Sequence, residues 1–126
     1  MRFPTLLLIA ALLSLGFGLS FLLVPGIALP LYGVDPTPTT TLRSRFFGAA
    51  LFQWGVALYL VREVREPATQ RGLVLAGVAG SAAGLAVALM GQLTGLVNAM
   101  GWSTVAIYGL LMLAFASLLR ARPATA

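Results

Sequence analysis

The sequence predicts an all-α membrane protein, an antiparallel bundle of four transmembrane helices with both termini in the cytoplasm. Four apolar segments of roughly 20 residues each follow one another in a chain of 126 residues. Each is long enough to cross a bilayer core of about 30 Å. Hydrophobic residues make up 60% of the chain and charged residues only 9%, whereas soluble domains carry about 25% charged residues. Residues 1–126 are therefore expected to form a single integral membrane domain.

The first predicted helix covers residues 5–28. Proline fixes the backbone and removes an amide donor, so Pro25 and Pro30 are expected to bend or end this helix near the outer surface. Residues 31–41 are rich in Gly, Asp, Pro and Thr, a composition typical of turns. They are expected to connect the first helix to the second.

The second predicted helix covers residues 42–66. One of the threonines at positions 39–41 is expected to cap its first turn, and Pro67 is expected to stop it. Arg62 and Glu66 lie four residues apart, so they are expected to pair on the helix surface. An exposed pair of this kind contributes little to stability.

The third and fourth predicted helices cover residues 70–92 and 98–119. Thr69 and Asn98 are the expected caps of their first turns. The connections between helices are short, so neighbouring helices are expected to run antiparallel in an up-down-up-down bundle.

Arginine supplies the positive charge of the chain, because eight arginines and no lysine stand against three acidic residues. Six arginines flank one side of the predicted membrane and two flank the other. This bias favours cytoplasmic termini and a cytoplasmic middle loop. The arginines lie at helix ends and form no basic face, so we expect contact with lipid phosphates and not with nucleic acid. The six are Arg2, Arg62, Arg65, Arg71, Arg120 and Arg122, and the two are Arg43 and Arg45.

The third predicted helix carries a row of small residues within about 100° of arc. Gly80 and Gly84 have the spacing that lets helix backbones approach closely in lipid. Two interpretations stay open: packing within the bundle, or a face that binds another chain. The row consists of Gly77, Gly80, Ser81, Gly84, Ala88 and Gly91, and the other side carries Ala79, Ala82, Ala83 and Ala86.

Four polar side chains are predicted near the bilayer centre, namely Ser14, Gln53, Ser81 and Tyr108. The Gln53 amide is costly there because hydrocarbon satisfies neither its donors nor its acceptor. Tyr108 is predicted at a matching depth and is the expected hydrogen-bond partner, in a contact worth about 1 kcal/mol. The alternative is a polar site for a ligand or a water path. Trp54 is also deep, and is expected to fill space or to contact a lipid, quinone or pigment.

Arg43 and Arg45 are predicted one or two turns inside the outer boundary of the second helix. An arginine at this depth snorkels to the surface, pairs, or holds an anion. Asp35 is the only acidic residue on that side. Two interpretations follow: anchoring to lipid, or contact with a specific anionic ligand or a partner subunit. The polar residues expected at similar depth are Gln92, Asn98, Ser103 and Thr104.

The chain lacks the residues on which most membrane chemistry depends. Cysteine and histidine are absent, so we expect no disulfide, no thiol chemistry, no Cys/His metal site and no haem ligand. The apolar stretches of the four helices, about 5–28, 44–61, 72–91 and 97–119, contain no acid, lysine or histidine to relay protons, and the serines have no base nearby. We therefore expect neither an enzyme nor a bound cofactor or metal. The absence of acid from residues 5–29 also separates the chain from small multidrug-resistance transporters, which need a glutamate in the first helix.

A pattern of residues in the first half of the chain carries a family resemblance. It comprises Pro25 after the first helix, Gly33 in the loop, the run from Arg43 to Ala49, and Gly55. In this pattern the chain resembles the DoxX-like group of small four-span bacterial membrane proteins, although it lacks the arginine that relatives often carry near residues 91–93. The resemblance implies a four-helix membrane fold in the inner membrane of a bacterium. It also implies a possible link to quinone-dependent oxidoreductases, since some members are described as their partners.

The sequence therefore predicts a non-catalytic integral membrane protein. Its expected role is that of an accessory or structural subunit, which packs against a larger membrane complex or against copies of itself. Two alternatives stay open. One is a carrier or channel for a small neutral or anionic solute, built from Gln53, Tyr108 and Arg45. The other is a subunit of a quinone-linked membrane oxidoreductase.

Overall fold

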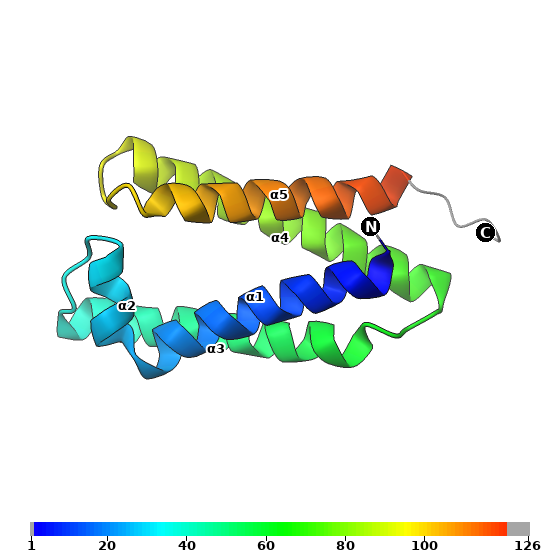
Figure 1. Cartoon of the computed structure of the whole chain (residues 1–126), viewed down its shortest axis with the longest axis horizontal. Helices are drawn as coiled ribbons and strands as arrows, with labels where there is room; N and C mark the ends of the chain where they lie inside the picture. Colours follow the sequence, from blue (N-terminus) through cyan, green and yellow to red (C-terminus); the bar gives the residue numbers. More distant parts are fainter. Residues whose placement is uncertain (1, 121–126) are drawn as a thin grey trace.

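The computed structural model describes residues 2–120, which fold into five α-helices (Figure 1). No strand occurs in this part of the chain. Four of the helices are long and apolar enough to cross a membrane, which confirms the predicted helical class and the number of long apolar helices. Arg122 lies outside the described residues. The helices are α1 (Phe3–Leu23), α2 (Pro25–Leu31), α3 (Pro38–Val61), α4 (Pro67–Leu93) and α5 (Gly101–Arg120).

The first apolar segment forms two helices, not the single predicted helix over 5–28. Val24 has φ −130° and ψ 52°, outside the helical range, and separates α1 from α2. A residue before proline avoids the helical region because the proline ring clashes with it. Proline itself is favoured at the first position of a helix. Pro25 therefore ends α1, as predicted, and also begins α2.

α3 begins at residue 38 and not at residue 42, because Thr37 is its N-cap. The Thr40 amide donates to the Thr37 hydroxyl at 3.1 Å, and the Thr37 amide donates to the Thr40 hydroxyl at 2.8 Å. This reciprocal pair is a capping box. The prediction of a cap at 39–41 is wrong, because Pro38 suits the first helical position and lets the helix begin earlier.

α3 ends at Val61 and α4 begins at Pro67, so the predicted extension of the second helix to residue 66 is wrong. Pro67 begins the next helix, for the same reason as Pro25 and Pro38. Thr69 therefore lies inside α4 and does not cap it. Its hydroxyl donates to the Glu66 carboxylate at 2.7 Å instead.

The predicted pair between Arg62 and Glu66 is also wrong, because the helix that would have aligned them stops before Arg62. The Arg62 guanidinium lies over the Tyr59 ring, 3.9 Å from its centroid, and its Nε lies 3.7 Å from the Glu63 carboxylate. α5 likewise begins at Gly101 and not at residue 98.

The helices form two hairpins that lie in two layers (Figure 1). α1 pairs with α3, α4 pairs with α5, and successive long helices run in opposite directions, as predicted. Between the layers, the main helix contact is that of α1 with α5. The arrangement is therefore more open than a closed four-helix bundle.

Glycines bring α1 and α3 into backbone contact. A Cβ on Gly48 would lie 2.6 Å from the Gly18 carbonyl oxygen, and one on Gly18 would lie 2.7 Å from the Phe52 amide nitrogen. One turn before Gly48, the buried Ser44 donates to the Phe21 carbonyl at 3.1 Å. Close contacts of this kind between small residues are typical of helix pairs in lipid.

The two hairpins share an apolar core near the beginning of the chain. It consists of Leu6 and Leu7 of α1, Leu58 of α3, Val74 of α4 and Phe115 of α5, together with two alanines of α1. All five of these large side chains are at most 4% exposed. This core fixes the layers against each other at one end of the molecule.

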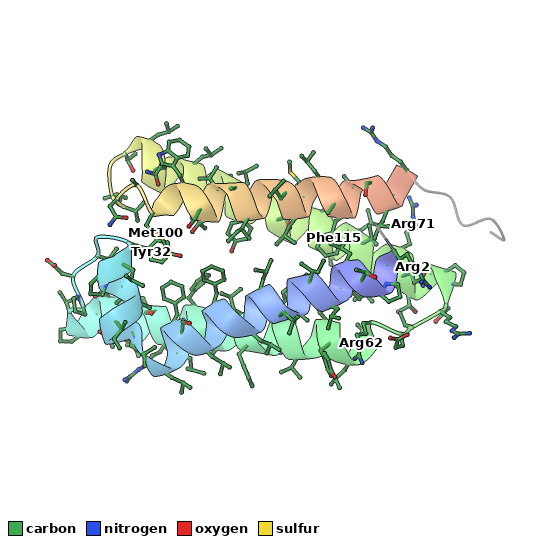
Figure 2. The ribbon with its side chains drawn as sticks, viewed as in Figure 1. Arg2, Tyr32, Arg62, Arg71, Met100 and Phe115 are labelled. Carbon is green, nitrogen blue, oxygen red and sulfur yellow. The ribbon has the colours of Figure 1, made fainter. Side chains whose placement is uncertain are left out.

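Arginines lie at the same end as this core. Figure 2 shows Arg2, Arg62 and Arg71 there, whereas Tyr32 and Met100 mark the opposite end. Both described chain ends, at the start of α1 and the end of α5, also lie on the arginine side (Figure 1).

Candidate functional site

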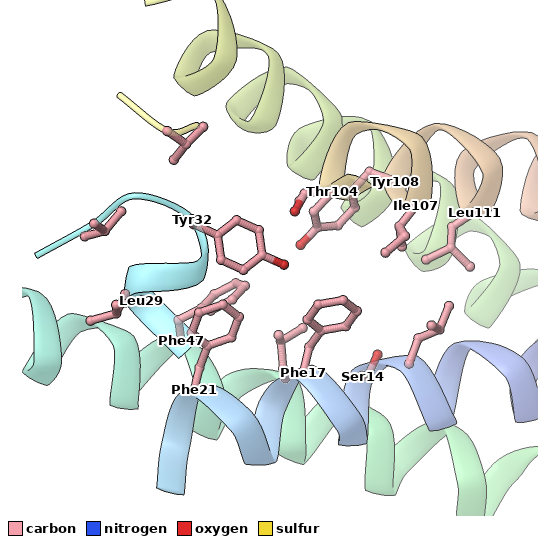
Figure 3. A pocket seen from close by; sticks show the side chains of 14 residues that line it. Ser14, Phe17, Phe21, Leu29, Tyr32, Phe47, Thr104, Ile107, Tyr108 and Leu111 are labelled. Carbon is pink, nitrogen blue, oxygen red and sulfur yellow. The ribbon is translucent and has the colours of Figure 1, made fainter. Parts of the chain in front are cut away.

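A cavity of about 280 Å³ separates the two hairpins where they diverge from their shared core. Phe17 and Phe21 of α1 and Phe47 of α3 form one wall (Figure 3). Thr104 and Tyr108 of α5 lie across from them. The cavity therefore lies between the layers and draws its lining from both hairpins.

Aromatic contacts hold the phenylalanine wall in place. The ring centroids of Phe21 and Phe47 are 5.4 Å apart at an interplanar angle of 68°, and those of Phe21 and Tyr32 are 5.8 Å apart at 39°. These distances fall in the range that favours aromatic pairs. Phe17 precedes Phe21 by four residues, so both lie on one face of α1. The wall is thus apolar and built from aromatic rings that contact one another at an angle.

Three hydroxyl groups face this apolar wall. Tyr32, Thr104 and Tyr108 all line the cavity, and the two phenol groups point into it (Figure 3). None of these hydroxyls makes a hydrogen bond to another group within residues 2–120. Ser14 lies on the α1 side of the same space. Unpaired hydroxyls in an apolar space are costly, so a molecule that accepts their hydrogen bonds gains affinity.

Asn98 joins the two hairpins at the loop end of the cavity. Its side-chain amide donates to the Leu31 carbonyl at 3.1 Å, and its backbone amide donates to the Tyr32 carbonyl at 3.0 Å. Gly33 packs against the Asn98 side chain with φ +76°, a conformation that other residues rarely adopt. The carboxamide oxygen of Asn98 also accepts from the Met100 amide at 3.0 Å. Asn98 therefore accepts from the Met100 backbone amide just before α5, as a cap does, and also links the two loops.

Among the residues that the structure describes, none with a charged side chain lines the cavity. Its walls consist of aromatic and aliphatic groups with four hydroxyls among them. An ion inside it would lose its hydration without gaining a counter-charge, which costs far more than a hydroxyl contact returns. The cavity therefore suits an uncharged molecule.

Of the four polar residues predicted at mid-depth, Ser14 and Tyr108 line the cavity. Ser81 is buried on α4 at 7% exposure. Gln53 is exposed on α3, on the side away from α1, so its predicted hydrogen bond to Tyr108 is wrong. The reason is the pairing of helices: α3 packs against α1, whereas Tyr108 lies on α5 in the other hairpin. Trp54 packs at the edge of the shared core.

The row of small residues on α4 is divided between two roles. Gly77 and Gly84 lie under the rings of Phe115 and Tyr108, as the interpretation of intrachain packing requires. Gly80 has no atom near its missing Cβ, and only the far end of Val97 approaches Gly91. These two lie at the edge of the arc, outside the line of contact with α5. Ala82 and Ala88 are half-buried, and Ala79, Ala83 and Ala86 are exposed.

Arg43 and Arg45 are exposed, and neither lines the cavity. The residue between them, Ser44, is the one that contacts α1. Gln53, Tyr108 and Arg45 do not meet, so the structure does not form the predicted carrier site. Contact of the two arginines with an anion or a partner stays a prediction.

Tyr32 and the phenylalanine wall were not among the predicted site residues. The sequence carries a signal for part of the wall, since Phe17 and Phe21 have helical spacing. Tyr32 lies in the turn that follows α2. Its place in the cavity depends on the contact of two loops, which no local pattern encodes.

The described part of the chain contains no group of three or more His, Cys, Asp or Glu side chains that could hold a metal. No family model, curated protein or solved structure matches the chain. The resemblance to the DoxX-like group is therefore a prediction that depends on the residues quoted for it.

Proposed function

We propose that this chain is an integral membrane protein that binds a small uncharged molecule between its two hairpins without transforming it. The observation that carries the proposal is the set of three unpaired hydroxyls, on Tyr32, Thr104 and Tyr108, that face an aromatic wall. The four long apolar helices support the membrane location. The cluster of arginines at the end shared by both described chain ends supports cytoplasmic termini.

The cavity limits what the ligand can be. Its volume of about 280 Å³ lies at the lower end of the range for small-molecule sites, about 300–1,000 Å³. One or two fused rings fit this space. A flat ring stacks against the phenylalanine wall, and carbonyl oxygens accept hydrogen bonds from the hydroxyls. The ligand class is therefore a flat, uncharged carbonyl compound, to which the ring systems of quinones belong.

Two probes of matched shape test this proposal. Menadione has a fused ring with two carbonyls, and 2-methylnaphthalene has the ring without them. Binding is measured by equilibrium dialysis against nanodiscs of fixed lipid content that contain the protein. We expect the Tyr108→Phe variant to bind menadione about 2- to 10-fold more weakly, because one hydrogen bond is lost. Its affinity for 2-methylnaphthalene should not change.

Tyr59→Phe is the matched control, because Tyr59 is an exposed tyrosine outside the cavity. It should bind both probes as the unmodified protein does. Equal affinity for the two probes would show that the cavity holds any apolar body, such as a lipid chain, and would overturn the proposed ligand class. Absence of binding above that of empty nanodiscs would overturn the site.

A second proposal is that the protein is an accessory subunit of a larger membrane complex. It is supported by the outer surface of α4, where Ala79, Gly80, Ala83 and Ala86 are exposed and offer a smooth surface for another helix. Native mass spectrometry of gently solubilised membranes tests it. A Gly80→Leu variant should release the partner, because the added side chain projects from this surface.

A further inference from the structure

The outward face of α3 carries a polar group that nothing in the described chain satisfies. Gln53 is exposed, and no hydrogen bond within residues 2–120 involves its amide. It lies eight residues from Arg45 and nine from Arg62, or about 12 Å and 14 Å along the helix. In the proposed membrane orientation, this amide faces hydrocarbon near the bilayer centre. An unsatisfied polar group there costs several kcal/mol.

The surroundings of Gln53 suit contact with another helix. Each residue of an α-helix is rotated by about 100° from the one before it. The side chains that therefore lie within about 80° of arc on this face are Phe46, Ala50, Gln53, Ala57 and Leu60. All five are exposed, with Phe46 at 69% and Leu60 at 72%. Ala50 and Ala57 flank the amide with small side chains, which allows a second backbone to approach.

The face of α3 opposite Gln53 packs against other helices of the same chain. Ser44, Gly48, Gly55 and Leu58 are buried, and the main neighbours of α3 are α1 and α2. The Gln53 face therefore remains available when the two hairpins are assembled. No rearrangement of the fold is needed to bring a partner to it.

We infer that two copies of this chain associate through α3, with the two Gln53 amides hydrogen-bonded to each other across a two-fold axis. A carboxamide carries both donors and an acceptor, so it is complementary to a copy of itself. Under two-fold symmetry each Nε2 donates to the Oε1 of the other copy, and both costly groups are satisfied by one closed contact. The inference rests on the proposed membrane location and not on the cavity or its ligand.

Disulfide cross-linking in native membranes tests this dimer, because the chain has no cysteine of its own. The Ala57→Cys variant places a thiol one turn from Gln53 on the same face, and we expect a disulfide-linked dimer under mild oxidation. The Leu113→Cys variant is the matched control, since Leu113 is exposed at 63% on α5, outside both proposed contact surfaces. It should give little or no dimer.

Two double variants distinguish the contribution of the Gln53 amide to dimerisation from that of the shape of this face. They combine Ala57→Cys with Gln53→Leu or with Gln53→Asn. Gln53→Leu should weaken dimerisation about 5- to 30-fold, whereas Gln53→Asn keeps an amide and should retain most of it. The side chain is exposed, so neither change disturbs packing within the chain. The readout is the dependence of cross-linked dimer on the ratio of lipid to protein.

Three outcomes would overturn the inference. They are equal cross-linking from Leu113→Cys, no effect of Gln53→Leu, or a cross-link to a different protein. Carbonate extraction separates this failure from that of the membrane proposal. A monomer in the membrane pellet contradicts only the dimer, whereas recovery in the aqueous supernatant contradicts both.

Discussion

Aromatic rings occupy the space that two glycines of α4 leave free. The Phe115 ring lies 2.6 Å from where a Cβ on Gly77 would be, and the Tyr108 ring crowds the same position at Gly84. Beyond the backbone of its own helix, no described atom lies within 4 Å of the missing Cβ of Gly80. Three glycines on one helix therefore differ in role, and the difference depends on which ring of α5 faces them.

The contrast between Gly77 and Gly80 gives a prediction for stability. Gly77→Ala should lower the free energy of unfolding by about 1–3 kcal/mol, because the new methyl group must displace a ring in the shared core. Gly80→Ala should leave it unchanged or raise it by up to about 1 kcal/mol, since alanine is the better helix former. Unfolding in mixed detergent with increasing dodecyl sulfate, followed by circular dichroism, measures both. Equal losses for the two variants would contradict this assignment of roles.

Tyr108 connects helix packing with the cavity. One face of its ring covers Gly84, and its hydroxyl points into the space between the layers. The position of this hydroxyl is therefore set by a glycine on a neighbouring helix. Replacing only the hydroxyl, as in Tyr108→Phe, is for this reason the least disruptive test of the site.

At the scale of helices, prolines determine where elements begin. Pro25, Pro38 and Pro67 each occupy the first turn of a helix, where the missing amide donor costs nothing. From sequence alone, Pro25 and Pro67 are predicted as ends of helices. Both prolines mark helix boundaries, but each also begins the helix that follows it. The early end of α3 at Val61 and the late start of α5 at Gly101 have no proline beside them, so these two errors have another origin.

The four long helices were predictable because span length and hydropathy are local properties of the chain. The site was predictable only in part, because depth in the membrane does not determine which way a side chain points. Gln53 and Tyr108 were predicted at matching depth, yet they belong to different hairpins and face different directions. Ser14 and Tyr108 were recognised as polar residues at mid-depth, but their common cavity depends on how the hairpins meet.

The loop link through Asn98 can be tested directly. Asn98→Ala removes the side-chain bonds to the Leu31 carbonyl and the Met100 amide but keeps the backbone bond to Tyr32. We expect a loss of about 1–3 kcal/mol in local opening free energy, and faster hydrogen exchange at residues 31–34 and 96–101. Hydrogen–deuterium exchange with mass spectrometry measures it.

Thr94→Val is the control for this link. The Thr94 hydroxyl bonds only carbonyls of its own helix, at Met90 and Gly91. Its loss should leave exchange at residues 31–34 unchanged. If Asn98→Ala also left that segment unchanged, the contact between the loops would not hold the two layers together.

The whole molecule is held at its two ends and is open between them. The shared core joins the layers near the arginines, and the Asn98 link joins them at the loops. The cavity occupies the region between these two connections. A ligand that fills the cavity contacts both hairpins at once. Ligand binding therefore stabilises the packing of one hairpin against the other. The same openness leaves the outer faces of α3 and α4 free for other chains.

Orientation in the membrane is a property of the whole chain, and arginine placement predicts it. The end that carries Arg2, Arg62 and Arg71 should face the cytoplasm. Because the chain has no cysteine, a single introduced thiol reports the side on which it lies. Leu96, at 73% exposure in the loop before α5, and Glu63, with a side chain at 72% exposure after α3, mark opposite ends.

In intact cells, a membrane-impermeant maleimide should label the Leu96→Cys variant but not the Glu63→Cys variant. Permeabilised cells should show labelling of both, which controls for reactivity. Labelling of both in intact cells would indicate two orientations, and the reverse pattern would show that arginine bias does not orient this chain. Replacing Arg62, Arg65 and Arg71 by glutamine in the Leu96→Cys background removes three of the six arginines on the predicted cytoplasmic side. If the bias is the cause, labelling of residue 96 from outside should fall, because part of the population then inserts the other way round.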